Sequence, residues 1–129
     1  MPPAWRSRLD RILFAMPEWG WVLLALGLRL LFAVKLGGRH HQIDEAGFDG
    51  AAWNLAVTGA PAALSSPVLP NVFFALCYRI WGHSLLYPRL AQAFVSAGAA
   101  WLLGRMTEAL SASKTAGRLA LLLAAVYPF

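Results

Sequence analysis

Three carboxylates stand close together in the first half of the chain, and they are the residues that first suggest chemistry. Asp44, Glu45 and Asp49 lie in "HQIDEAGFDGAAWNLAVTG", residues 41–59, which holds half of the chain's six acidic residues. A carboxylate beside a bound hydroxyl group can accept its proton in the transition state. The stretch therefore predicts a general base or an electrostatic partner for a substrate, with Asp44 and Glu45 as the candidates.

The same acids also suit a purely structural role. Apolar residues recur at near-helical intervals from about residue 44, and Gly59 suits the left-handed position that follows a helix. Asp44 as N-cap and Glu45 in the first turn would satisfy free N–H groups and favour the helix dipole. Both interpretations stay open on the sequence alone.

The sequence contains no recognisable set of metal ligands. His40 and His41 precede the acids, but adjacent histidines point in different directions, and no H-x-x-x-H spacing occurs. The single Cys77 excludes an internal disulfide and cannot complete a zinc site. We therefore predict no metal-binding residues.

The composition is that of a membrane protein. Of 129 residues, 59% are hydrophobic and only 13% charged, with six Trp, and the mean hydropathy is +0.56. A soluble domain of this length could not hide so much apolar surface. The net charge of +5 comes from Arg and Lys dispersed among apolar runs, which predicts anchors at the membrane faces and excludes a nucleic-acid surface.

Apolar runs and charge define the elements that must position the acids. Residues 18–37 are long enough to cross a bilayer, and Arg29 and a poor cleavage site argue against a signal peptide. Residues 115–129 are shorter than a full span, so we expect the chain to be a piece of a longer protein. We therefore predict a cytoplasmic interfacial helix over 1–17, ended by Pro17, and transmembrane helices over 18–37, 86–105 and 115–129. An outer loop over 38–85 and a cytoplasmic loop over 106–114 connect them. Ser111 or Ser113 is predicted to cap the last helix.

The outer loop is predicted to carry two juxtamembrane helices, at about 44–58 and 70–82. The apolar part of the second, Val72 to Trp81, is about half the length that crossing requires. The positive-inside rule places the N-terminal arm and the 106–114 loop in the cytoplasm, which leaves the acids outside. The expected fold is an all-α, multi-pass protein integral to the cytoplasmic (inner) membrane, with a cytoplasmic N-terminus, three transmembrane helices and amphipathic juxtamembrane helices in the first outer loop.

Two features of the spans predict neighbours. Ala93, Ala97, Ala100 and Gly104 recur at spacings of three and four, which leaves a groove for the close approach of another helix. Arg29 near the middle of the first span should point into protein, because a charge in lipid is costly. The groove also allows an alternative function, a small noncatalytic scaffold or subunit that binds another membrane protein.

The order of these features resembles the N-terminal part of GT-C-fold membrane glycosyltransferases. The group concerned is that of the protein O-mannosyltransferases, the lipid A aminoarabinose transferases and the bacterial RgtA-to-D-like enzymes. The resemblance lies in "DEAGFDGAAWNL", then "SPVLPNVFFALCYRIWG", then "RLAQA", and finally the closing "VYP". It covers nearly the whole chain in the same order.

The resemblance implies an inverting transfer of a sugar from a polyprenyl-phosphate donor to an acceptor hydroxyl at the outer face. Asp44 and Glu45 fall on the family's acidic pair, and the first acid is the one proposed to accept the hydroxyl proton. Asn54 falls on its A-x-N-L stretch, and Phe48 stands where the family usually has Tyr. Arg89 or Arg79 would contact the donor phosphate.

The same resemblance names the partners. They are membrane lipid, the lipid-linked sugar and further C-terminal helices of the same protein, with no nucleic acid. The sequence establishes no cofactor, and a divalent metal ion is compatible with the chemistry. On this view the chain alone is an inactive N-terminal fragment of the enzyme.

Overall fold

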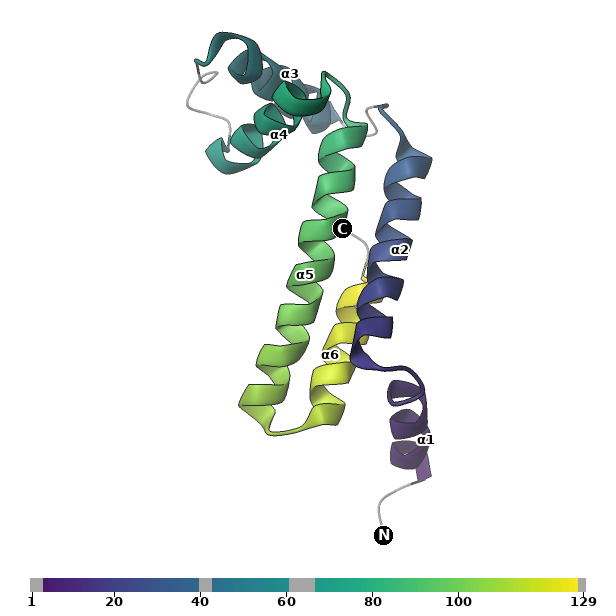
Figure 1. Ribbon diagram of the computed structural model, residues 1–129. Coiled ribbons are helices and arrows are strands. Elements are labelled where there is room, and N and C mark those ends of the chain that lie inside the picture. Colours follow the sequence, from purple (N-terminus) through teal and green to yellow (C-terminus); the bar gives the residue numbers. More distant parts are fainter. Residues whose placement is uncertain (1–3, 40–42, 61–66, 128–129) are drawn as a thin grey trace. The chain divides into compact units, whose positions relative to one another are not determined.

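A computed structural model describes residues 4–39, 43–60 and 67–127, and within these ranges the chain is all-helical without strands (Figure 1). The predicted all-α class is thus confirmed. The described part divides into two compact units: one reaches up to Leu31 and resumes at Ala93, and the other comprises Phe32–Gln92. The helices are α1 (Ala4–Leu13), α2 (Glu18–Leu36), α3 (Ile43–Thr58), α4 (Val68–Trp81), α5 (Leu86–Ser111) and α6 (Lys114–Val126).

Helices α2, α3, α4 and α6 begin and end within a few residues of the predicted bounds, whereas α1 and α5 differ. Helix α1 ends at Leu13 instead of continuing to Pro17. The carbonyl of Pro17 accepts the N–H of Gly20 at 2.9 Å, so this proline belongs to the start of α2, where its missing N–H costs nothing. Helix α5 continues to Ser111, because the residues from 106 to 110 are mostly good helix formers.

The loop predicted over 106–114 is therefore reduced to a tight turn. Ala112 adopts a left-handed conformation with φ 50°, and Ser113 is the N-cap of α6, its hydroxyl accepting the N–H of Ala116 at 3.3 Å. The predicted cap is confirmed at Ser113. The hydroxyl of Ser111 instead donates to the carbonyl of Thr107 at 2.6 Å.

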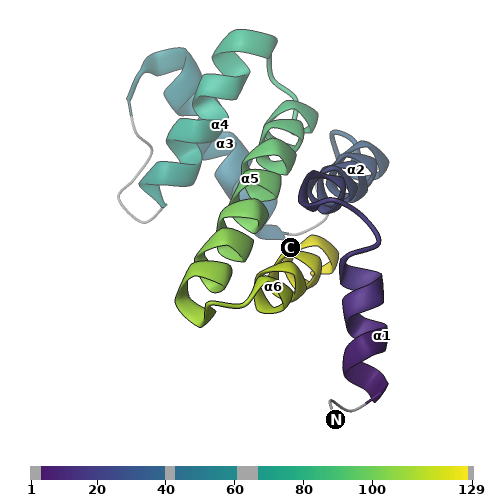
Figure 2. The same ribbon diagram turned by 60° about the horizontal axis from the view of Figure 1, so that its bottom comes forward.

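Small residues let α5 and α6 approach closely within the first unit, where the two helices lie side by side (Figures 1 and 2). A Cβ added at Gly117 would lie 2.8 Å from the carbonyl oxygen of Gly104. The predicted stripe of small residues is buried in the chain itself: Ala93, Ala97 and Ala100 are each less than 5% exposed. The groove is thus covered within the chain. The scaffold or subunit alternative stays a prediction.

Arginine side chains close two helix ends in this unit. As predicted, Arg29 points into protein, and its side chain is 8% exposed. Its guanidinium donates to the carbonyls of Ala124 at 2.6 Å and Ala125 at 3.4 Å, in the last turn of α6. Arg118 donates to the carbonyl of Leu13 at 2.9 Å, where α1 ends. Carbonyls of a last helical turn have no partner within the helix, so these contacts stabilise both ends.

Helix α2 is the helix in the described ranges that is long and apolar enough to cross a membrane. Length and composition alone identify it, and a signal sequence or the core helix of a soluble protein meets the same two criteria. Leu23 and Leu31 are more than half exposed, as expected of a lipid-facing helix. Helix α5 has 26 residues but is interrupted by polar and small residues, and α6 has only 13. The predicted set of three transmembrane helices is therefore not established.

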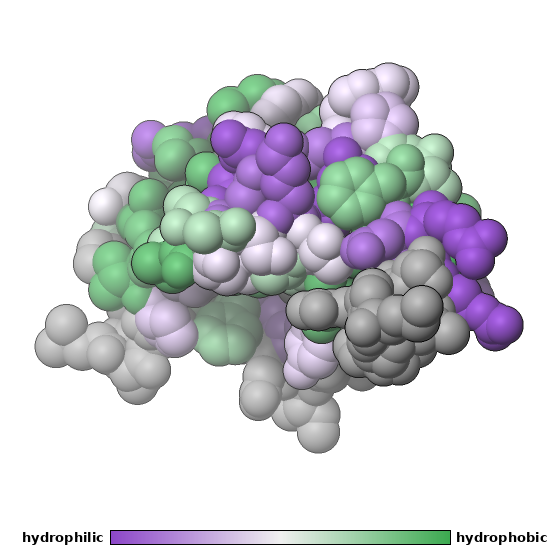
Figure 3. Space-filling model, turned by 90° about the horizontal axis from the view of Figure 1, so that it is seen from below, coloured by the Kyte–Doolittle hydropathy of each residue, from purple (hydrophilic) through white to green (hydrophobic). Residues whose placement is uncertain are grey.

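The face seen from below mixes hydrophilic and hydrophobic residues side by side (Figure 3). Two arginines of α1, Arg8 and Arg11, are exposed, and so is Lys114 at the start of α6. Cationic side chains beside exposed apolar ones are typical of a surface at the lipid headgroups. The role of these cations as membrane-face anchors stays a prediction.

The packing of α5 on α6 predicts opposite effects for two glycine substitutions. Gly117→Ala should lower the free energy of unfolding by about 1–3 kcal/mol, because the added methyl group meets backbone on the facing helix. Gly98→Ala should raise it by up to about 1 kcal/mol, since a Cβ there meets no described atom within 4 Å and alanine favours a helix. Thermal unfolding in detergent, followed by circular dichroism, measures both. Equal effects would contradict the close approach.

Candidate functional site

The second unit contains the acidic stretch on α3, which packs against α4 (Figures 1 and 2). Ala52 and Ala56 of α3 form a buried cluster with Ala75 and Tyr78 of α4. Alanine at these positions allows the two helices to lie close together. Gly59 then ends α3 with φ 73°, the left-handed conformation predicted for it.

Asp49 is the buried polar centre of this helix pair. Its residue is 8% exposed, and its Oδ1 accepts a hydrogen bond from the hydroxyl of Tyr78 at 2.6 Å. The Nε2 atom of His83 lies 3.0 Å from the same oxygen. Burying a carboxylate costs free energy unless hydrogen-bond donors contact it. Tyr78 and His83 therefore offset the cost of burying Asp49.

Two aromatic rings contact the histidine. Trp53 stacks on His83 with ring centroids 4.5 Å apart and an interplanar angle of 24°. Tyr78 meets His83 edge to face, at 5.0 Å and 89°. We call these four residues, Asp49, Trp53, Tyr78 and His83, the Asp49 cluster.

Burial and the Asp49 carboxylate act together on the phenol of Tyr78. Tyr78 is 2% exposed. Burial, and then the hydrogen bond to Asp49, raise the pKa of Tyr78 well above its ordinary value, because both disfavour the phenolate. Tyr78 thus stays a hydrogen-bond donor over the whole physiological range.

Arg89 links the acidic end of α3 to the end of α2. Its guanidinium donates to the carbonyls of Gly37 at 2.6 Å and Arg39 at 3.0 Å, just after α2 ends. The same group donates to both carboxylate oxygens of Glu45, at 3.1 and 3.2 Å. The Arg89 side chain is only 10% exposed, so water weakens these charged hydrogen bonds little. The first turn of α3 is therefore held at the end of α2.

Two of the predicted site residues, Glu45 and Arg89, are brought together by this ion pair. Asp44 lies in the first turn of α3, one residue inside the helix and not at the N-cap, and its side chain is outside the described residues. A phosphate contact by Arg89 stays a prediction, and a phosphate would compete there with Glu45 and two carbonyls. Phe48 is half-buried in the same helix.

The other two predicted residues serve the far end of α3. Arg79 donates from Nε to the carbonyl of Ala56 at 2.9 Å, in the last turn of the helix. Asn54 is exposed, and both its carbonyl at 2.8 Å and its Oδ1 at 3.4 Å accept from the hydroxyl of Thr58. These contacts stabilise the end of α3, and no described contact joins Arg79 or Asn54 to Glu45 and Arg89.

Sequence reasoning assigned no role to Asp49, Tyr78 or His83. One available signal was the spacing of Glu45 and Asp49, since residues i and i+4 share a helix face. An acid on the same face as Ala52 and Ala56 must find donors on whatever packs there. The sequence does not identify those donors, because Tyr78 and His83 lie 29 and 34 residues from Asp49 along the chain.

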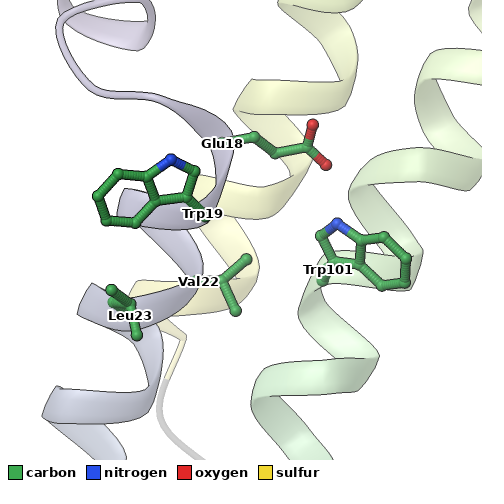
Figure 4. Close-up of a pocket in the computed structure, with 5 residues that line it drawn as sticks. All are labelled: Glu18, Trp19, Val22, Leu23 and Trp101. Carbon is green, nitrogen blue, oxygen red and sulfur yellow. The ribbon is translucent and has the colours of Figure 1, made fainter.

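No group of metal ligands competes with this site in the described residues. No group of three or more His, Cys, Asp or Glu there could hold a metal ion, and His40 and His41 lie outside those residues. An open hollow on the first unit is mainly apolar, whereas ligand sites combine apolar walls with convergent polar groups. It is lined by Glu18, Trp19, Val22, Leu23 and Trp101 (Figure 4).

The raised pKa of Tyr78 predicts a loss of stability at high pH. The unfolded chain releases the phenol proton above pH about 10, whereas the folded protein retains it. The stability contributed by this group is therefore complete below that pH and falls as the pH rises above it. The difference in free energy of unfolding between wild type and Tyr78→Phe, about 1–3 kcal/mol at neutral pH, should shrink.

The measurement is chemical unfolding in detergent at a series of pH values from neutral to about 11, across the ordinary tyrosine pKa. The control is Tyr87→Phe, which alters an exposed ring and should leave the wild-type stability nearly unchanged. A difference between wild type and Tyr78→Phe that stays constant over this range would contradict the assignment.

The second unit thus offers an acidic helix start fixed by an arginine and, one helical turn on, a buried carboxylate that orients a histidine. Such groups can accept protons and bind hydroxyl groups. Likeness to known proteins adds no assignment: no family model, curated protein or solved structure matches this chain.

Proposed function

We propose that the chain is the N-terminal part of an integral-membrane inverting glycosyltransferase. It would move a sugar from a polyprenyl-phosphate donor to an acceptor hydroxyl at the outer face of the membrane. The observation that carries this proposal is the position of Glu45, which Arg89 ties to the carbonyls of Gly37 and Arg39 at the end of α2. An acidic helix start is thereby held where an apolar helix of spanning length ends.

The chemistry suits that place. A polyprenyl chain keeps its sugar and phosphate at the membrane interface, so the reacting carbon is presented next to the end of a spanning helix. Asp44 accepts the proton of the acceptor hydroxyl while the oxygen attacks the anomeric carbon. The bond from that carbon to the phosphate oxygen breaks, and the lipid phosphate leaves with the electron pair. Attack opposite to the leaving group inverts the anomeric centre.

The two neighbouring acids take different parts in this proposal. Glu45 has the Arg89 guanidinium as its partner, which balances its charge. Asp44, the other member of the pair, is then the proton acceptor. A divalent metal ion is compatible with the reaction as a counter-charge for the leaving phosphate, and the transfer requires no other cofactor.

The proposal includes a topology. Helices α2, α5 and α6 cross the inner membrane, with α1 at the cytoplasmic face and α3 and α4 at the outer face. The support for α4 lying along the membrane surface is its row of exposed apolar residues, Leu69, Leu76 and Ile80, beside a buried face that contacts α3. Its 14 residues span about 21 Å, which is less than a bilayer core.

The test is sugar transfer from radiolabelled polyprenyl-phosphate sugars in membranes that contain the protein expressed from its complete reading frame. Asp44→Asn should lower the rate by about 10²- to 10⁴-fold at equal protein level, because a general base is lost. Glu108→Gln is the control, since it changes a half-buried carboxylate that pairs with the exposed Arg105 and keeps the shape of the side chain, so the variant should retain the wild-type rate.

Two results would count against the proposal. An unchanged rate in Asp44→Asn would leave that carboxylate a helix-start residue and remove it as the base. Absence of transfer by the wild-type protein from every polyprenyl-phosphate sugar tried would overturn the reaction itself.

A further inference from the structure

Asp49 fixes the proton arrangement of His83. The Nε2 atom of His83 lies 3.0 Å from Oδ1 of Asp49, and an ionised carboxylate only accepts hydrogen bonds. The Nε2 atom must therefore carry the proton in the neutral ring, which makes Nδ1 the atom with the lone pair. In the described part of the chain Nδ1 has no hydrogen-bond partner.

The ring is also fixed in orientation. Trp53 stacks on one face of His83, and Tyr78, itself hydrogen-bonded to Asp49, meets the ring edge to face. The His83 side chain is nevertheless 42% exposed, against 11% for that of Asp49. The histidine ring is thus held on an aromatic support, and a large part of its side chain is exposed.

We propose that His83, together with Trp53, forms a subsite for a hydroxyl-bearing sugar ring, with Nδ1 accepting a hydrogen bond from one hydroxyl. The proposal rests on the proposed glycosyl transfer and specifies a binding group for it. A neutral Nδ1 lone pair selects a donor and not an anion, and the nearby Asp49 charge also disfavours phosphate. Aromatic walls with a few oriented polar groups are the usual lining of small-molecule sites.

Two substitutions at His83 distinguish the roles of its two nitrogen atoms. Asn places a carbonyl oxygen near the Nδ1 position, so His83→Asn keeps an acceptor for the ligand and loses the contact with Asp49. Gln places its amide near the Nε2 position, so His83→Gln keeps a donor to Asp49 and loses the acceptor. Neither side chain can take a proton.

Steady-state transfer by the complete protein, with donor and acceptor varied in turn, gives the first readout. His83→Gln should raise KM for one substrate about tenfold, the loss expected for one hydrogen bond, with kcat nearly unchanged. His83→Asn should raise the same KM less. The substrate whose KM changes identifies the bound sugar as the donor's or the acceptor's. Unchanged KM values in both variants, or a loss of kcat in both at constant KM, would overturn the subsite.

A second readout does not need transfer activity. Diethyl pyrocarbonate modifies a free imidazole nitrogen, and trypsin releases His83 in the peptide Ile80–Arg89, apart from His40 and His41. Glucose, mannose or arabinose should slow modification of His83, whereas sulfate should not. Absence of protection by all three sugars, or equal protection by sulfate, would overturn the subsite.

The two readouts keep the proposals apart. If the wild-type protein transfers no sugar, the proposed function fails and sugar protection of His83 alone decides the subsite. If transfer occurs and depends on Asp44 while KM and protection do not depend on His83, the subsite fails and the proposed function stands.

Discussion

Backbone carbonyls at the ends of helices need hydrogen-bond donors, and the described structure meets that need with arginine side chains. Arg118 donates to the end of α1, Arg89 to the carbonyls that follow α2, Arg79 to the end of α3 and Arg29 to the end of α6. Where such a contact is shielded from water, as at Arg29, losing it would cost more than at an aqueous surface. Arginines dispersed along an apolar sequence thus stabilise the ends of its helices.

The same constraint shapes the candidate site. Arg89 satisfies two carbonyls after α2, and its remaining hydrogen-bonding capacity reaches Glu45. The acidic start of α3 is therefore positioned by the group that closes the preceding helix. One side chain thus contacts both the end of α2 and the start of α3, so helix capping and the proposed catalysis are compatible interpretations of this stretch.

The Asp49 cluster also depends on the need of buried polar groups for hydrogen-bond partners, here between α3 and α4. A carboxylate on the packed face of α3 requires donors from α4 and the residues after it, and Tyr78 and His83 supply them. With both groups in place, the histidine ring is held in one orientation beside the carboxylate. The buried Asp49 thereby orients His83 at the edge of the cluster.

Local periodicity was sufficient to predict most of the helices. Glycine, proline and serine signals placed the end of α3 at Gly59 and the cap of α6 at Ser113, because these residues act within a few positions of themselves. The stripe that includes Ala97 and Gly104 correctly indicated close helix packing, since spacing along a helix sets which side chains share a face. The prediction of a loop over 106–114 was wrong because residues that favour a helix continue through Glu108 and Leu110. The turn that follows has only two residues, and so short a turn leaves little trace in the sequence.

The partners of each polar group were decided only by the tertiary structure. The pairs Arg89 with Glu45, Asp49 with His83 and Arg29 with Ala124 are separated by 44, 34 and 95 residues. Periodicity specifies a face of a helix but not which helix covers it or at what height. For that reason the sequence by itself determined that this chain is helical, apolar and acidic at one helix start, whereas folding decided which charges are paired and which ring contacts the buried Asp49.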